Sequence, residues 1–477
     1  MNLLNKKNIL YLSITLFFVG AFLRFYQINF ESYWWDEMLG FWVADPNITT
    51  NETIYRQRNH DLTSVIFHFI IKNFYKIFGY NPELGRYIPL FFGILSIPFL
   101  GILSKQVKNN NSYLISILLI SINIYLISYS QETRHYSLVF LVSIINLIIY
   151  YNIVFSINFG IKKIFIFFLF IFFSILSLSI SPFILIIFFS QIAYLIYEVF
   201  FLKKKNYLII LSTPIIIIFY VILNYDFLFT DLAKQNNHFI ANIEWNFIYN
   251  LFFPRFFGSS IMGFIYLFLL LFLLIYNRQK IFLKSSKYPP LIFILLLSYI
   301  VPFIYGILFA PILFDRYIIF VLIPIILLLS TLIYEVKNNH LKNIIILILL
   351  IPSLINIFLE VALRDETKPE FSQLLKYFET SEVKNITILT DKEIISQKTL
   401  DIVENYINSR NITKKNNFKI LNFHNLPENI NSIWVICYER FTGPVCKIPK
   451  NKTTNFQLLD SIKFYLLEAK LIKVKKL

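Results

Sequence analysis

Long apolar segments recur along most of this 477-residue chain, and they restrict its fold more than any other feature. A helix needs about 20 mainly apolar residues to cross the hydrocarbon core of a bilayer. Segments of this kind occur about eleven times before residue 364, at 8–27, 84–103, 113–129, 138–157, 164–180, 182–201, 207–223, 256–276, 290–309, 317–334 and 344–363. The sequence therefore predicts a mainly α-helical, polytopic membrane protein with about eleven transmembrane helices.

The placement of basic residues predicts the orientation of these helices. A net charge of +16 is compatible with nucleic-acid binding, but here the charge gathers in alternate loops. These loops hold Lys105 and Lys108, Lys162 and Lys163, Lys203 to Lys205, Arg278 to Lys287, and Lys337 and Lys342. Cytoplasmic loops carry such an excess. We expect a plasma (inner) membrane protein with a cytoplasmic N-terminus, an exoplasmic C-terminus and no nucleic-acid partner.

One further apolar segment, 62–78, is not predicted to cross the membrane. It carries His68, Lys72 and Lys76, and a crossing here would place the later lysine clusters outside the cell. We expect it to lie in the membrane interface or to re-enter it, within a long first exoplasmic loop at 29–83.

The composition changes near Arg364, which divides the chain into a membrane domain (1–363) and a water-facing domain (364–477). Apolar residues recur at helical spacing in 371–378 and 394–407, whereas 386–389, 418–423 and 432–438 are typical of short buried strands. These patterns predict a small exoplasmic α/β domain.

Both cysteines, Cys437 and Cys446, lie in the C-terminal domain on either side of Gly443-Pro444. A disulfide between them is permitted in an exoplasmic compartment. Two reduced, unrelated cysteines are the alternative.

Three polar clusters are predicted to face the exoplasmic side. The first contains Trp34, Trp35, Asp36 and Glu37, followed by Arg58, His60 and Asp61; the second contains Tyr129, Glu132 and Arg134; the third contains Arg316 and Tyr317. A carboxylate beside an apolar wall can act as a general base near neutral pH. Arginine is suited to binding phosphate. Together they match transfer from a lipid-linked sugar phosphate, in which the base deprotonates a hydroxyl and the arginines stabilise the departing phosphate.

Each cluster also has a structural interpretation. Trp34 and Trp35 can anchor a helix end at the interface, and Asp36 can be a helix N-cap. Arg134 and Arg316 can be loop-end charges that reach for water. No metal-spaced Cys/His set and no glycine-rich phosphate loop occurs in the sequence, so we predict no cofactor.

The order of these motifs resembles the membrane glycosyltransferases of the GT-C class. The matching residues are Asp36-Glu37, Asn59-His60-Asp61, the segment 85–89 with Arg86, the turn 129–136, and Arg316-Tyr317. Within this class, the chain resembles the branch that comprises protein O-mannosyltransferases, lipid A aminoarabinose transferases and Rgt-type sugar transferases. The resemblance implies a GT-C-like membrane fold, a polyprenyl-phosphate-linked sugar donor, inverting transfer, and Asp36 as the base.

We therefore predict an enzyme that transfers a sugar from such a donor to a lipid, glycan or protein of the cell envelope. The catalytic candidates are Asp36 and Glu37, and the candidate phosphate or substrate contacts are Arg58, His60, Asp61, Tyr129, Glu132, Arg134, Arg316 and Tyr317. An envelope-lipid transporter or flippase, or an O-antigen ligase or polymerase, is the alternative. We expect the C-terminal domain to position the acceptor without contributing to the donor site.

Overall fold

A computed structural model describes most of the chain. The described residues are 5–61, 64–155, 161–201, 207–223, 255–281, 283, 286–308, 312, 314–380, 385–390, 397–409, 419–421, 430–438, 454–464 and 467–476.

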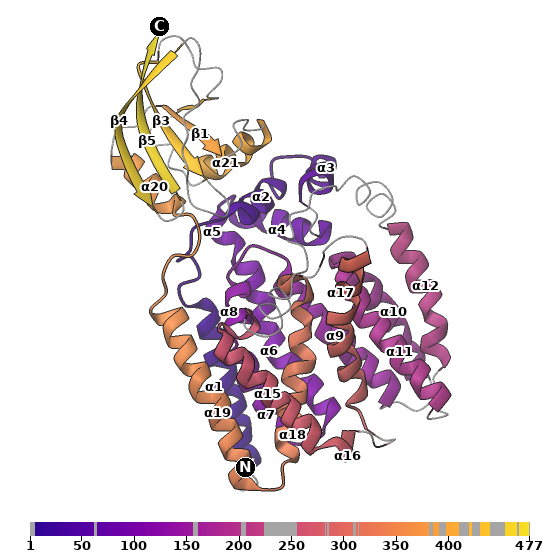
Figure 1. Ribbon diagram of the computed structural model, residues 1–477. Helices are drawn as coiled ribbons and strands as arrows, with labels where there is room; N and C mark the ends of the chain where they lie inside the picture. The colour runs from indigo at the N-terminus through magenta and orange to yellow at the C-terminus, as the bar shows by residue number, and fades with distance from the viewer. Residues whose placement is uncertain are drawn as a thin grey trace. The chain divides into compact units, whose positions relative to one another are not determined.

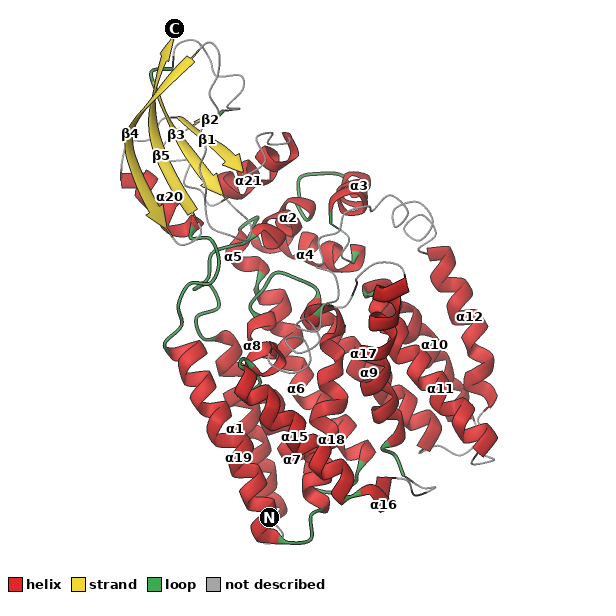
Figure 2. Cartoon of the chain, viewed as in Figure 1, coloured by secondary structure: helices red, strands yellow, loops and turns green. Residues whose placement is uncertain are grey.

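The chain forms two compact units, each assembled from separate segments. The first comprises Met1–Tyr26, Leu62–Phe67 and Tyr87–Arg364, and we call it the helical unit. The second comprises Gln27–Asp61, His68–Arg86 and Asp365–Leu477, and we call it the mixed unit because it holds the strands (Figure 2). The first loop, which the sequence assigns to the membrane domain, therefore packs with the C-terminal segment.

Helices account for the described secondary structure of the helical unit (Figure 1). They are α1 (Lys6–Phe25), α6 (Tyr87–Val107), α7 (Ser112–Ser121), α8 (Ile124–Ser130), α9 (Tyr136–Phe155), α10 (Ile161–Ile180), η1 (Pro182–Ile184), α11 (Leu185–Phe201), α12 (Tyr207–Leu223), η3 (Arg255–Phe257), α15 (Ser260–Tyr276), α16 (Arg278–Ile281), α17 (Pro289–Leu308), η4 (Asp315–Val321), α18 (Leu322–Glu335), α19 (Asn339–Ile357) and η5 (Phe358–Ala362).

Seven helical segments of the described residues are long and apolar enough to cross a membrane. The pair α7 and α8 forms an eighth if it counts as one span, and shorter apolar helices cover Ile164–Ile180, Ser212–Ile222 and Ser260–Tyr276. Each predicted span thus contains a helix, while the count of about eleven crossings stays a prediction.

The bend between α7 and α8, which measures 57°, shapes the end of the helical unit that holds the polar turn 129–136. Asn123 caps α8 by accepting a hydrogen bond from the Leu126 amide at 2.9 Å, and its own amide donates to the Phe256 carbonyl at 3.0 Å. A side chain thus satisfies backbone groups that a break inside an apolar segment would otherwise expose.

Small residues let the helices of this unit approach closely. A Cβ at Gly20 of α1 would lie 2.5 Å from the Ser121 hydroxyl of α7. The hydroxyl of Ser116 lies 2.9 Å from that of Ser104 and 2.6 Å from that of Ser330, which links α6, α7 and α18. Close packing and hydroxyl contacts of this kind hold helices together where apolar burial gives little advantage over lipid.

The mixed unit combines helices with one five-stranded sheet. Its helices are α2 (Trp35–Val43), α3 (Thr50–His60), α4 (Val65–Phe78, whose first residues belong to the helical unit), α5 (Pro82–Gly85), α20 (Phe371–Thr380) and α21 (Gln397–Ser409). Its strands are β1 (Asn385–Thr390), β2 (Lys419–Ile420), β3 (Ser432–Tyr438), β4 (Thr454–Phe464) and β5 (Leu467–Lys476), in the order β2-β1-β3-β5-β4. Strand β1 is parallel to both β2 and β3, and β5 is antiparallel to β3 and β4.

The core of the mixed unit is shared between the first loop and the C-terminal segment. Met38, Leu39 and Trp42 of α2 pack in one cluster with apolar residues of α20, α21 and the sheet. The C-terminal partners include Phe371, Leu374, Phe378, Ile402, Tyr406, Trp434 and Ile436. Full burial of a large apolar side chain stabilises a fold by about 1.5–3 kcal/mol. Helix α2 is therefore held in place by residues more than three hundred positions later in the chain.

Candidate functional site

Asp36 lies in the first turn of α2 and is 9% exposed. The N-cap of this helix is Trp34, so the interpretation of Asp36 as an N-cap is wrong. Within the first turn the helix dipole stabilises a carboxylate. Trp35, next to it, packs against the core of the mixed unit. Asp36 thus belongs to a helix that is held by apolar burial of Met38, Leu39 and Trp42.

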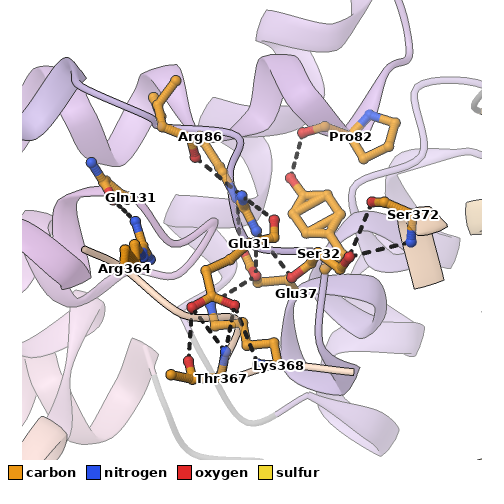
Figure 3. A network of polar contacts seen from close by, with 12 residues as sticks. Glu31, Ser32, Glu37, Pro82, Arg86, Gln131, Arg364, Thr367, Lys368 and Ser372 are labelled. Carbon is orange, nitrogen blue, oxygen red and sulfur yellow. Dashed lines mark hydrogen bonds and ion pairs between the residues drawn. The ribbon is translucent and has the colours of Figure 1, made fainter. Parts of the chain in front are cut away.

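Glu37, the second acid of the pair, is fully buried and bound by two cations (Figure 3). Arg86 donates to it through Nε at 3.0 Å and through Nη2 at 2.9 Å, and Lys368 donates at 3.2 Å. The same guanidinium also donates to the carbonyls of Ile28 and Glu31, at 3.1 and 2.7 Å. This bidentate geometry is typical of strong Arg–carboxylate pairs. Both Glu37 oxygens are occupied by cations, which favours Asp36 over Glu37 as the base.

The other candidates of the first cluster occupy different surroundings. Asp61 is buried and its carboxylate lies 3.3 Å from Nε2 of His68. His60, at the end of α3, packs beside the ring of Trp42 at 5.7 Å, whereas Arg58 is exposed. The structure therefore places Asp61 in a buried pair and Arg58 at the surface of the mixed unit.

Lys72 of α4 shows how the polar face of this helix is used. Its buried ammonium donates to the Ile48 carbonyl and to the Thr53 hydroxyl, both at 2.7 Å. With 14 residues α4 is shorter than a spanning helix. Its position in the membrane interface stays a prediction.

The second and third polar clusters meet in the helical unit around the ring of Tyr136. The ring of Tyr129 packs edge-on against Tyr136 at 5.0 Å, and the guanidinium of Arg316 lies 5.8 Å from the centre of the same ring. Arg134, from the turn before α9, is buried. Tyr129 of the second cluster and Arg316 of the third therefore lie beside the same ring, although 180 residues separate Tyr136 from Arg316.

Around Arg316 the third cluster is bounded by aromatic and charged groups. Tyr317 stacks on Phe183 at 4.8 Å with an interplanar angle of 19°. The Asp315 carboxylate lies 3.5 Å from Nη1 of Arg255. Glu132, in the second cluster, accepts the backbone amide of Arg134 through its own carbonyl at 2.6 Å. Arginines beside aromatic rings suit a ligand that joins an anion to an apolar chain.

Sequence reasoning did not identify the residues that support these clusters. Gln131 accepts from Arg364 at 2.7 Å, and its amide donates to the carbonyls of Arg24 and Tyr26 (Figure 3). Arg24, itself buried, donates to the Ile120 carbonyl at 2.9 Å. The sequence offers one signal for these supporting residues, namely Arg24 near the end of the apolar segment 8–27. These contacts fix the turn 129–136 against the end of α1.

Two predictions concern groups beyond these clusters. Cys437 is buried in β3, but Cys446 lies outside the described residues, so their pairing stays a prediction. Among the residues that the structure describes, no group of three or more His, Cys, Asp or Glu side chains could hold a metal ion.

Comparison with known proteins identifies the fold. No protein-family profile and no curated protein matches the sequence. The apo crystal structure of the oligosaccharyltransferase of Archaeoglobus fulgidus is similar with a TM-score of 0.51 and 12% identity, over 86% of this chain and 65% of that one. The same archaeal enzyme, AglB, in complex with an inhibitory peptide and a dolichol-phosphate gives a TM-score of 0.50 and 12% identity, over 90% and 69%. The chain thus spans about two thirds of the length of this neighbour, with which it shares its fold.

Proposed function

We propose that this protein is a membrane glycosyltransferase that transfers a sugar from a polyprenyl-phosphate-linked donor to an acceptor of the cell envelope. The observation that carries the proposal is the fold shared with an archaeal oligosaccharyltransferase whose complex contains a dolichol-phosphate and a peptide. The buried acid of α2 and the arginine–tyrosine clusters add the chemistry that such a transfer requires.

Asp36 is the proposed base. Its carboxylate takes the proton of the acceptor hydroxyl while the hydroxyl oxygen attacks the anomeric carbon of the sugar. The new carbon–oxygen bond forms on the face opposite to the phosphate, and the bond from the anomeric carbon to the phosphate oxygen breaks. The phosphate leaves with the electron pair of that bond, so the configuration is inverted.

Arg134 and Arg316 are the proposed contacts of the departing phosphate. Always-charged guanidinium groups stabilise the negative charge that develops on the leaving group. The rings of Tyr129 and Tyr317, which are partly exposed, offer apolar surface for the sugar and for the first part of the polyprenyl chain. In this proposal the reaction takes place on the exoplasmic face, with the N-terminus in the cytoplasm.

The test is a transfer assay with the purified full-length protein in proteoliposomes. Radiolabelled polyprenyl-phosphate sugars are offered with envelope extracts, and both glycosylated product and released polyprenyl phosphate are measured. Asp36→Asn is expected to lower the rate about 10²–10⁴-fold. Asp401→Asn, an exposed acid of α21, is the matched control.

Each other outcome has a definite meaning. Retention of more than about half the wild-type rate by Asp36→Asn would exclude this residue as the base. Movement of intact donor across the bilayer, with no release of polyprenyl phosphate from any donor, would contradict a transferase and identify a flippase instead.

A further inference from the structure

A short connecting segment, residues 365–370, leads into α20 and is fixed by the first loop of the mixed unit. The buried carboxylate of Glu31 accepts hydrogen bonds from the Thr367 amide and from the Lys368 amide, both at 3.2 Å. It also accepts from the Thr367 hydroxyl at 2.8 Å (Figure 3). One carboxylate thus fixes two consecutive peptide units of the connecting segment.

Just after the connecting segment, the start of α20 is fixed by a second contact. The Ser32 hydroxyl donates to the Ser372 hydroxyl at 3.0 Å and accepts from the Ser372 amide at 3.2 Å. Glu31 and Ser32 are consecutive, and both precede α2 by a few residues. These contacts therefore fix the connecting segment relative to the residues that precede α2.

In this arrangement the side chain of Lys368 reaches the first turn of α2. Its ammonium lies 3.2 Å from Oε2 of Glu37 and 5.8 Å from the centre of the Trp34 ring. Glu37 is fully buried, and a buried carboxylate is stable only while its charge is compensated. Arg86 supplies one positive charge from the end of the first loop, and Lys368 supplies the other from the C-terminal segment.

We propose that Lys368 is a positioning residue for sugar transfer: through Glu37 it fixes the first turn of α2, and thereby the carboxylate of Asp36. The inference rests on the proposed function. It gives the C-terminal domain a part in the chemical step, beyond the positioning role that the sequence predicts for this domain. A misplacement of about 1 Å at a reacting group can slow a reaction about 10²-fold, so a loosened first turn is sufficient for a measurable effect.

The kinetic test compares Lys368→Met, Lys368→Arg and Lys376→Met in the full-length protein. Lys376 is an exposed lysine of α20 and serves as the control. For Lys368→Met we expect kcat to fall about 10- to 100-fold with donor KM unchanged, because the proposed phosphate contacts belong to the other unit. Lys368→Arg, which keeps the charge, is expected to restore most of kcat. Equal kcat values for Lys368→Met and Lys376→Met would overturn the inference, as would a joint change in kcat and KM that arginine does not rescue.

A second measurement needs no substrate and separates this inference from the proposed function. Hydrogen exchange of the amides of residues 35–39 is recorded for the wild type and the same variants. Lys368→Met is expected to accelerate exchange there, while Lys376→Met leaves it unchanged. Unchanged exchange in Lys368→Met would overturn the positioning role even if sugar transfer is demonstrated. Accelerated exchange in a protein that transfers no sugar would overturn the proposed function alone.

Discussion

The helical unit and the C-terminal helices of the mixed unit, α20 and α21, expose different kinds of side chain. Large apolar side chains point outward from the helical unit, as Phe18, Phe168 and Phe268 show with exposed fractions of 64%, 63% and 73%. In α20 and α21 of the mixed unit, Leu374 and Phe378 are fully buried, whereas Lys376 and Glu404 are exposed. The first surface suits lipid and the second suits water. The chain therefore carries one surface suited to lipid and one suited to water, and each unit contains some of the candidate residues.

The two units also differ in the contacts that specify them. In the helical unit several hydroxyls donate to a carbonyl one turn earlier, such as Ser143 to Val139, beside longer-range contacts such as that of Ser116 with Ser330. In the mixed unit, ion pairs and hydrogen bonds connect residues more than 330 positions apart, such as Lys368 and Glu37. Both units therefore contain long-range contacts, but those of the mixed unit join the first loop to the C-terminal segment.

Truncation after Leu363 should have the largest effect, because it removes the C-terminal part of the mixed unit and leaves the spans of the helical unit in place. Without α20, α21 and the sheet, Met38, Leu39 and Trp42 of α2 lose their core. We expect the helical unit to insert into the membrane, sugar transfer to be lost, and the segment 27–61 to become sensitive to protease. Protease footprinting with mass spectrometry would measure this. A first loop that remains protected in the truncated protein would contradict the shared core.

Substitution of Arg86 tests the buried charges of the mixed unit. Arg86→Met removes the bidentate cation from fully buried Glu37 and keeps the ion pair with Lys368. Removal of one partner of a buried ion pair costs about 3–5 kcal/mol. Thermal unfolding should show the loss, with Lys376→Met as the surface control. A change of less than about 1 kcal/mol would mean that Glu37 takes up a proton or finds another partner.

Arg134→Lys tests the helical unit, where we expect a functional rather than a structural effect. Lysine keeps the positive charge but loses the planar fork that matches a phosphate. Donor KM should rise about tenfold, with little change in unfolding temperature. Steady-state kinetics with varied donor would measure this rise. An unchanged KM would remove Arg134 from the proposed phosphate site.

The smallest expected effect is a pH dependence of the stability of the mixed unit, caused by Glu366. Partial burial, and next the neighbouring carboxylate of Glu31, raise the pKa of Glu366 to about 7, while Glu370 adds repulsion and the Ser32 backbone opposes the shift. Because the folded state holds this proton more tightly than the unfolded state, stability is lost as pH rises from the ordinary range of a glutamate toward 7. Glu366→Gln should unfold at a higher temperature than the wild type near pH 8, and this advantage should shrink near pH 5. Asp460→Asn, an exposed acid of β4, is the control, and an advantage independent of pH would contradict the explanation.

The sequence predicts the helical unit well because the requirement for apolar length acts on each segment separately. It does not predict the break after Ile122, where no proline or glycine occurs, since the Asn123 amide finds its partner in Phe256, 133 residues later. Strands β4 and β5 are also missed, because lysines such as Lys470 and Lys473 interrupt the apolar pattern.

For the candidate site, the residue types were predictable but the pairings were not. Asp36 and Glu37 are adjacent in sequence and look equivalent there, yet in the structure Glu37 is bound in bidentate fashion by an arginine 49 residues away. The meeting of Tyr129 and Arg316 around Tyr136 likewise depends on the packing of α9 against η4. Long-range packing decides which of several similar polar residues lie together.

The discontinuous core of the mixed unit has a consequence for synthesis. Helix α2 is made early, but its apolar partners from Phe371 onward emerge about 330 residues later. At roughly 5–20 residues per second, that interval lasts on the order of tens of seconds. During this time the nascent chain carries Asp36 on a helix without its core. A chain that terminates within this interval lacks the apolar partners of α2 and cannot hold Asp36, the proposed base, in position. Activity therefore requires complete translation.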